Sequence, residues 1–339
     1  MRTIVLGVVM CLPAAVVRAQ PLFELKPVVE GVYAAIAQPQ FKVNCNAAVI
    51  LLDDSVLVVD THSKPSAARA LIDAVKKISS KPIRFVVNSH FHWDHYQGNQ
   101  AYTSAWPTGV EIISSQQTHD NIERIGVPRV KHEIVAVPKQ IDQLKTELAA
   151  AAAADQRTIR ENLRQLEAYL AELRTMEVTL PTLTFDRSLV LRRKGRTVQI
   201  LWMGRAHTDG DVVVYLPKER FIATGDMLHG WIPYMGDSYP FEWIATLEAV
   251  SRLDFDYVVG GHGDVMRGKS QFEFWIAYFG DLMQQTVNAY AAGATIEQAR
   301  SQVTTWLTDK YQKRFANFTK ASIEGNVDKA FRVISGQMR

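Results

Sequence analysis

The stretch NSHFHWDHYQGN, residues 88–99, places three histidines and one aspartate within six positions. It continues the run IRFVVNS, which is typical of a buried strand, so the histidines fall in a loop at the carboxyl end of that strand. Such loops are where α/β proteins commonly present functional groups. Imidazole and carboxylate are ligands that a catalytic zinc ion prefers. The stretch therefore indicates a metal site at the edge of a sheet.

Three single residues further along the chain share this context, because each directly follows a short apolar strand and lies near glycine. His207 follows WMGRA, Asp226 follows FIATG and His262 follows YVVGG. If these strands share one sheet, their carboxyl ends converge on the loop at residues 88–99. Five of the nine histidines belong to this set, so chance clustering is a poor explanation. The residues expected to bind metal are His90, His92, Asp94, His95, His207, Asp226 and His262.

Short apolar runs and one helical pattern surround these positions. GVYAAIA, NAAVILL and SVLVVD predict successive strands between residues 31 and 60, with a hairpin turn at residues 53–55. Pro65 opens a segment with helical spacing of its apolar residues, and four more strands are expected from SLVLRR to RFIATGD. This alternation predicts one α/β domain over residues 20–267.

Residues 139–176 interrupt the α/β alternation. Asp155 is a candidate N-cap, and the apolar residues after it repeat at intervals of four, three, four and three. The segment therefore predicts an inserted hairpin of two helices with a structural role. The alternatives are a lid beside the site and a contact within a homo-oligomer. Residues 268–339 are expected to form a helical C-terminal extension.

The first nineteen residues have the pattern of a secretory signal peptide. Arg2 precedes an apolar run, and the segment ends in the small residue Ala19. We expect an exported protein, periplasmic or secreted, without a stable membrane anchor. Cleavage would remove Arg2 and Arg18 and lower the net charge from +3 to +1, which argues against a nucleic-acid partner. Only Cys45 would remain, so no intramolecular disulfide is expected, and we predict a buried thiol.

The motif HxHxDH at residues 90–95, followed in order by His207, Asp226 and His262, resembles the metallo-β-lactamase superfamily. Asp60, which ends the run VLVVD, matches the acidic residue that this family has before its first helix. The resemblance covers residues 28–265. It implies a four-layered αβ/βα sandwich with the site at one edge of two facing sheets.

The resemblance also implies which residues bind metal and which surround it. Two zinc ions are expected, with iron and manganese as alternatives. The first would be held by His90, His92 and His207, the second by Asp94, His95 and His262, and Asp226 would bridge them. Asp60 would orient a ligand, or else cap the following helix. His229, Trp231 and Tyr234 would line the substrate pocket, or else form a packed aromatic loop.

The activity implied by the resemblance is hydrolysis of a small-molecule substrate by a dinuclear zinc enzyme. A metal-bridging hydroxide would attack the carbonyl of a small ester, thioester, lactone or lactam, and Asp94 is the candidate to take up its proton. The chain has no GxSxG motif that would favour a serine nucleophile. Resistance-type β-lactamases usually have cysteine or serine at the position of Asp226. β-Lactamase activity is therefore an alternative, as is a non-haem iron oxidoreductase of the persulfide dioxygenase type.

Overall fold

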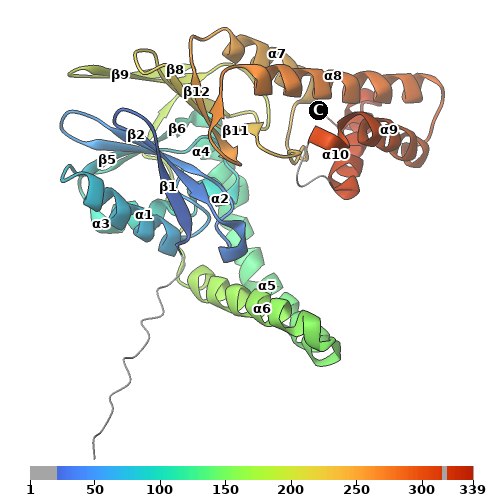
Figure 1. The fold of residues 1–339 in the computed structure, drawn as a ribbon, viewed down its shortest axis with the longest axis horizontal. Coiled ribbons are helices and arrows are strands. Elements are labelled where there is room, and N and C mark those ends of the chain that lie inside the picture. The colour runs from blue at the N-terminus through green and yellow to red at the C-terminus, as the bar shows by residue number, and fades with distance from the viewer. Residues whose placement is uncertain (1–20, 315–318, 339) are drawn as a thin grey trace, which may run out of the picture.

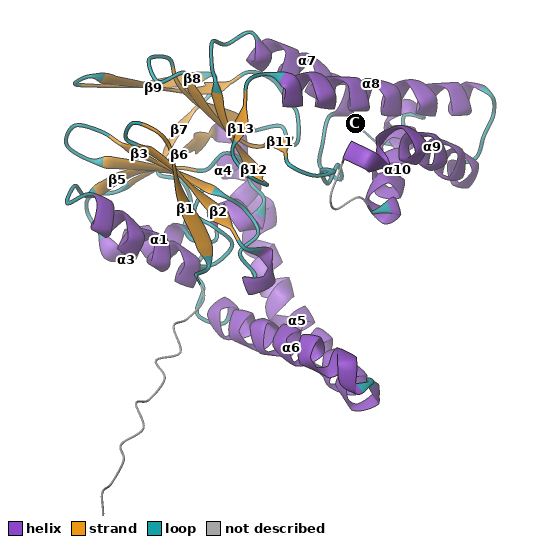
Figure 2. Cartoon of the chain, in the orientation of Figure 1, coloured by secondary structure: helices purple, strands orange, loops and turns teal. Residues whose placement is uncertain are grey.

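The computed structural model describes residues 21–314 and 319–338, so the predicted signal peptide at residues 1–19 lies outside the described residues. Two sheets face each other across a shared apolar core, and helices cover the outer face of each sheet (Figure 1; Figure 2). The layers are therefore helices, sheet, sheet and helices. This arrangement confirms the predicted four-layered α/β fold.

The first sheet has seven strands that follow one another in chain order. They are β1 (Phe23–Val29), β2 (Val32–Ala37), β3 (Ala47–Leu51), β4 (Val56–Val59), β5 (Ile83–Val87), β6 (Glu111–Ser115) and β7 (Leu183–Phe185). Strands β4 to β7 are parallel, whereas β1 to β4 pair antiparallel. The carboxyl ends of β4 and β5 therefore lie side by side at one edge, where the loop at residues 88–99 begins.

The second sheet has six strands in the order β13-β12-β11-β10-β9-β8. They are β8 (Ser188–Arg193), β9 (Arg196–Trp202), β10 (Val212–Leu216), β11 (Phe221–His229), β12 (Tyr257–His262) and β13 (Met266–Arg267). Strand β11 is parallel to β12, and β10 is antiparallel to both β9 and β11. Strands β9, β11 and β12 therefore all end at the same edge of this sheet.

Strand β4 shows why the first sheet has apolar residues on both faces. Val56 and Val58 pack against the outer helices α1 (Pro65–Ile78) and α3 (Asn99–Ala105), while Leu57 and Val59 pack toward the second sheet. Successive side chains of a strand point to opposite faces, so a strand covered on both sides is apolar throughout. This explains the continuous run VLVV.

Strand β1 was not predicted, because the expected strands began at residue 31. Pro27 lies inside it, and proline cannot donate a ladder hydrogen bond. The strand is nevertheless formed because β1 is the edge of its sheet, where only one neighbour requires pairing.

The inserted helices begin earlier than predicted. Helix α4 (Gln116–Asn121) continues through a π-helical segment (Ile122–Gly126) into α5 (Val127–Ala150), and α6 (Ala153–Leu173) packs back against α5. The predicted start at residue 139 is wrong, because the helix passes through Pro138 and buries Val130 and Val137 against α6. Asp155 lies in the first turn of α6, where the helix dipole favours an acid, but the N-cap is Ala152.

The C-terminal helices share one apolar core with the second sheet. Helices α7 (Pro240–Ser251), α8 (Ser270–Ala291), α9 (Ile296–Tyr311) and α10 (Lys320–Ile334) follow β11 and β12 (Figure 1). Trp243, Trp275, Leu307 and Phe331, one from each helix, are buried in the same cluster as Ile222 of β11. Among the described residues, none of the helices combines the length and apolar character needed to cross a membrane.

Candidate metal centre

The seven residues predicted to bind metal lie together at the edge where β5, β9, β11 and β12 end. The loop after β5 leads into the short helix α2 (Trp93–Tyr96), and the remaining positions lie after β9, within β11 and at the end of β12. All of the seven except His92 are buried: His90, Asp94, His95, His207, Asp226 and His262. The structure thus brings together every side chain of the predicted set.

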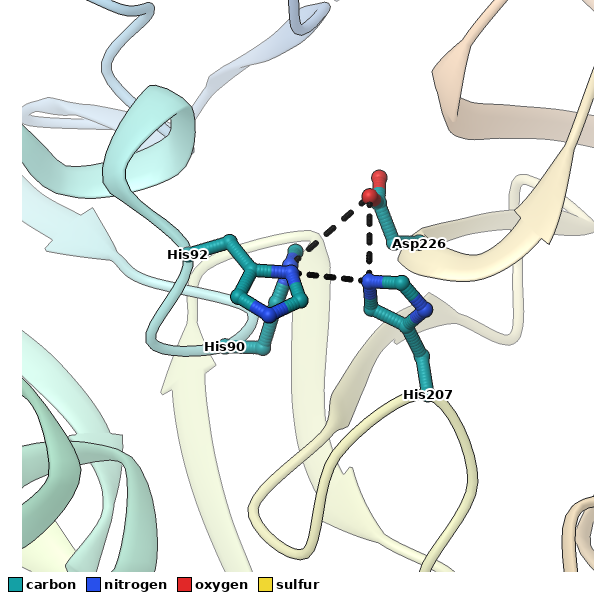
Figure 3. Close-up of side chains that lie close together, drawn as sticks. All are labelled: His90, His92, His207 and Asp226. Carbon is teal, nitrogen blue, oxygen red and sulfur yellow. Dashed lines mark hydrogen bonds and ion pairs between the residues drawn. The ribbon is translucent and has the colours of Figure 1, made fainter. Parts of the chain in front are cut away.

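The first group of ligand atoms belongs to His90, His92, His207 and Asp226, whose donor atoms all lie within 4.8 Å of one another (Figure 3). His92 Nδ1 is 2.8 Å from His207 Nε2. Asp226 Oδ2 is 3.4 Å from His207 Nε2 and 3.8 Å from His90 Nε2. Three nitrogen atoms and one carboxylate oxygen therefore converge on one point.

The second group consists of Asp94, His95 and His262, again within 4.8 Å. His262 Nε2 is 3.1 Å from Asp226 Oδ2, and His95 Nε2 is 3.2 Å from Asp226 Oδ1. Asp94 Oδ2 lies 3.7 Å from His262 Nε2 and 3.8 Å from His95 Nε2. Because Asp226 faces both groups, its carboxylate is placed between them.

Unpartnered nitrogen atoms test whether these residues fit metal ions. Within residues 21–314 and 319–338, His90 Nε2 and His95 Nε2 are buried without a hydrogen-bond partner. Leaving a buried polar atom unpaired costs about 1–3 kcal/mol. A divalent ion satisfies such lone pairs, and imidazole with carboxylate is a donor set that suits zinc. The two groups of donor atoms therefore fit metal binding, with the Asp226 carboxylate facing both.

Asp60 holds two of the histidine rings in place. It accepts a hydrogen bond from His95 Nδ1 and two more from the backbone N–H and the hydroxyl of Ser89, each 2.8 Å long. The Ser89 hydroxyl in turn lies 3.0 Å from His90 Nδ1. The N-cap of α1 is Lys64, so Asp60 does not cap that helix. Both rings are therefore fixed with Nε2 toward the ligand groups.

Two further partners of the histidines were missed by sequence reasoning. His92 Nε2 is 3.0 Å from Asp237 Oδ2, and this hydrogen bond lowers the pKa of the Asp237 carboxyl. His262 Nδ1 is 2.8 Å from the backbone oxygen of Asn44. No motif marks these partners, because each joins segments that are distant in the chain.

Burial and neighbouring charges together set the protonation of the site. It lowers the pKa of His90 and of His207 well below the ordinary value, so both imidazoles keep a free lone pair at neutral pH. Burial alone would raise the pKa of the Asp226 carboxyl, but the charges of His262, His229 and His95 outweigh it and hold this pKa well below its usual range. Asp226 is therefore a carboxylate.

Two of the three predicted pocket residues line a cavity beside the site. The cavity, of about 320 Å³, lies between the loop at residues 231–236 and α10. The Trp231 ring is 4.8 Å from the His262 ring, and the Tyr234 ring is 5.9 Å from the His92 ring. His229 does not line the cavity, because it is buried beside Asp226.

The base of the inserted hairpin reaches the metal-site loop. Tyr169 of α6 donates a hydrogen bond of 3.2 Å to Gln97, and its ring lies 6.1 Å from that of Trp93. The Arg129 guanidinium of α5 stacks over the Trp93 ring at 5.4 Å. The hairpin thus supports α2, which carries Asp94 and His95.

A glycine permits the close approach of β12 to Asp226. A Cβ atom on Gly261 would lie 1.9 Å from Asp226 Oδ1 and 3.0 Å from His95 Cε1. Such a contact is impossible without displacement of the carboxylate. The packing of the site therefore requires a glycine at position 261 of β12.

Comparison with known proteins agrees with this geometry. The family model of the metallo-beta-lactamase superfamily matches residues 41–262. A linear primary-alkylsulfatase from Pseudomonas sp. (strain ATCC 19151) is 26% identical over 233 residues, covering 65% of this chain and 42% of that protein. A type 2 metallo-beta-lactamase from Elizabethkingia meningoseptica is 25% identical over 87 residues, covering 24% of this chain and 35% of that protein. The chain spans less than half the length of these curated relatives.

Solved structures show the same fold. A metallo-beta-lactamase from Pontibacter korlensis has a TM-score of 0.56 at 14% identity, covering 76% of this chain and 99% of its own. A metallo-beta-lactamase from Pseudomonas aeruginosa, in a mono-zinc form, has a TM-score of 0.55 at 15% identity, covering 76% and 95%. From its family match, its fold and its ordered His/Asp set, the chain belongs to the metallo-beta-lactamase superfamily.

Proposed function

We propose that this protein is a metal-dependent hydrolase that holds two zinc ions. The observation that carries the proposal is the position of Asp226, whose carboxylate faces a group of three histidines on one side and Asp94, His95 and His262 on the other. When bound in such a site, zinc activates water and polarises the bond to be cleaved.

Asp94 is the residue we assign to proton uptake from the attacking water. Its side chain is only 10% exposed, and its Oδ2 lies 3.7 Å from His262 Nε2. The Cys45 thiol donates a hydrogen bond of 2.6 Å to the backbone carbonyl oxygen of Asp94 and so fixes the backbone of that residue. A carboxylate fixed in this way can bind an ion and accept a proton without large movement.

The substrate we propose is a small ester, thioester, lactone or lactam. The presence of a carboxylate at Asp226, rather than cysteine or serine, favours substrates other than β-lactams. The cavity lined by Trp231, Ile232 and Tyr234 would accept an apolar part of the substrate beside the His92 and His262 rings.

The test combines metal analysis with a hydrolysis screen of the purified, zinc-loaded protein. We expect about two zinc ions per chain and hydrolysis of at least one of the four substrate classes. Asp94→Ala should abolish hydrolysis while the protein stays folded, and His119→Ala, outside both ligand groups, should not change it. One iron per chain with oxygen consumption on a persulfide would refute the hydrolase and support the oxidoreductase.

An alkyl sulfate ester is a second candidate substrate. It is favoured by the similarity to a linear primary-alkylsulfatase together with the apolar residues of the cavity beside the site. Release of inorganic sulfate from a medium-chain alkyl sulfate by the same preparation tests this candidate. No sulfate release, with turnover of carbonyl esters, would leave only the first substrate class.

We also propose export of the chain and self-association through the hairpin of α5 and α6. Export rests on the pattern of residues 1–19 and is tested by the mass of the mature protein, which should begin after Ala19. Self-association would use the outer faces of α5 and α6, where Val135 is an exposed apolar side chain. Light scattering should give the mass of a homo-oligomer that falls to the mass of one chain when the hairpin is deleted, and a full chain that is already monomeric would exclude self-association.

A further inference from the structure

The side chain of His229, the last residue of β11, points in a direction that the alternation of a regular strand does not predict. In a regular strand, residues 226 and 229 would point to opposite faces. The pairing of β11 with β12 is irregular between Gly225 and His229, and this irregularity turns both side chains to one side. Irregularities of this kind often redirect a side chain next to an active site.

The ring of His229 is enclosed by the metal centre. Its side chain is 4% exposed, and its ring stacks on that of His262, with 5.1 Å between centroids and 14° between planes. The His207 ring lies 5.4 Å away. The backbone oxygen of His229 accepts hydrogen bonds from Trp275 and Gln271 of α8, at 2.9 and 3.1 Å, so the position of the residue is fixed from outside the site.

Neither ring nitrogen of His229 has a hydrogen-bond partner within residues 21–314 and 319–338, although both are buried. Among the buried histidines of the described residues, only His229 lacks a hydrogen-bond partner on both ring nitrogens. Each of the others has a partner on one nitrogen. An imidazole buried in this way loses the hydrogen bonds that it makes to water in the unfolded chain. Burial of the unpaired His229 ring therefore lowers the stability of the fold unless a ligand binds one of its nitrogens.

The nearest polar group is the carboxylate shared by the two ligand groups. His229 Nε2 is 3.5 Å from Asp226 Oδ2, and the same oxygen is 3.1 Å from His262 Nε2. The donor atoms of Asp226, His229 and His262 all lie within 4.8 Å of one another. Two imidazoles and one carboxylate are a common ligand set for a divalent transition metal.

We propose that His229 is an additional metal ligand, which binds a zinc ion together with Asp226 and His262. Because His262 also belongs to the group of Asp94 and His95, the ion concerned is the second one, and its retention depends on His229. This inference rests on the proposed zinc centre and adds a ligand to it. The first ion, held by His90, His92 and His207, should not depend on His229.

The experiment is zinc binding in competition with a chromophoric chelator. His229→Phe keeps an aromatic ring against His262 but removes the donor atoms, and His119→Ala is the control outside the ligand groups. We expect His229→Phe to weaken the second zinc by about tenfold or more and to leave the first zinc unchanged. Equal weakening of both ions, or of neither, would overturn the assignment.

A second measurement uses the wild-type protein, so it does not depend on whether His229→Phe folds. In a crystal structure of the zinc-loaded wild-type protein, a ring nitrogen of His229 should lie about 2.0–2.1 Å from zinc. Two bound ions with both nitrogens of His229 beyond bonding distance would overturn this inference and leave the proposed hydrolase intact. A wild-type protein that binds no zinc would overturn both.

Discussion

Replacing Asp60 by asparagine tests whether the outer hydrogen bonds set the metal affinity. Asp60 accepts from Ser89 N–H, from the Ser89 hydroxyl and from His95 Nδ1, all at 2.8 Å. The Ser89 hydroxyl donates to Asp60, so it can only accept from His90 Nδ1. One carboxylate therefore keeps the proton on Nδ1 of both histidines and leaves both Nε2 atoms free for metal.

An asparagine at this position must direct its N–H₂ group at one of these donors. The Ser89 backbone N–H cannot change, so the amide should face His95 and the Ser89 hydroxyl instead. His95 then accepts on Nδ1 and carries its proton on Nε2, where it blocks the ion. The reversed Ser89 hydroxyl imposes the same change on His90. Loss of such a partner typically costs 10- to 100-fold in metal affinity, which is about 1.4–2.7 kcal/mol.

The assay is a zinc titration against a chromophoric chelator, with circular dichroism of the metal-free variant to check its fold. Asp60→Asn should weaken both ions by about 10- to 100-fold. Ser89→Ala is the matched variant: it breaks only the relay to His90, so it should weaken the first ion and spare the second. Unchanged affinity for both ions in Asp60→Asn would refute the reasoning, as would a loss confined to the first ion.

Three other predictions concern single residues. Asp237→Asn should lower the affinity for the first zinc ion by less than tenfold in the same titration, because the Asp237 side chain is 43% exposed and water can replace its hydrogen bond to His92. A larger loss of affinity would contradict this prediction. Gly261→Ala should lower the free energy of unfolding by about 1–3 kcal/mol and prevent the protein from binding two zinc ions, because the new Cβ would lie 1.9 Å from Asp226 Oδ1. If urea denaturation gave the wild-type free energy of unfolding, the clash would be disproved. Burial raises the pKa of the Cys45 thiol to about 12, so the thiol stays protonated at pH 8. In a Cys11→Ser variant, a disulfide reagent should therefore label Cys45 only after the protein unfolds, and rapid labelling of the native protein would argue against burial of the thiol.

Much of the ligand set follows from the sequence, because its members occupy recognisable positions. His90 and His207 follow the ends of β5 and β9, His262 is the last residue of β12, and Asp226 lies inside β11 near its end. Strands that run in one direction end at one edge of a sheet, so adjacency can be inferred without coordinates. The helical insertion was also visible from its repeat, although Pro138 concealed the first half of α5.

The sequence by itself indicated an α/β domain, because strand and helix patterning is a local property, and its ordered histidines and aspartates indicated a metal site. The four-layered sandwich followed from the resemblance to the metallo-β-lactamase superfamily. Only the tertiary structure decided the partners that fix the ligands, such as Asp237 on His92 and the Asn44 carbonyl on His262. It also decided that His229 lies against Asp226, because this depends on an irregularity in the pairing of β11 with β12. The direction of a side chain at a strand end changes with a shift of one residue in register, and that register is set by packing between distant segments.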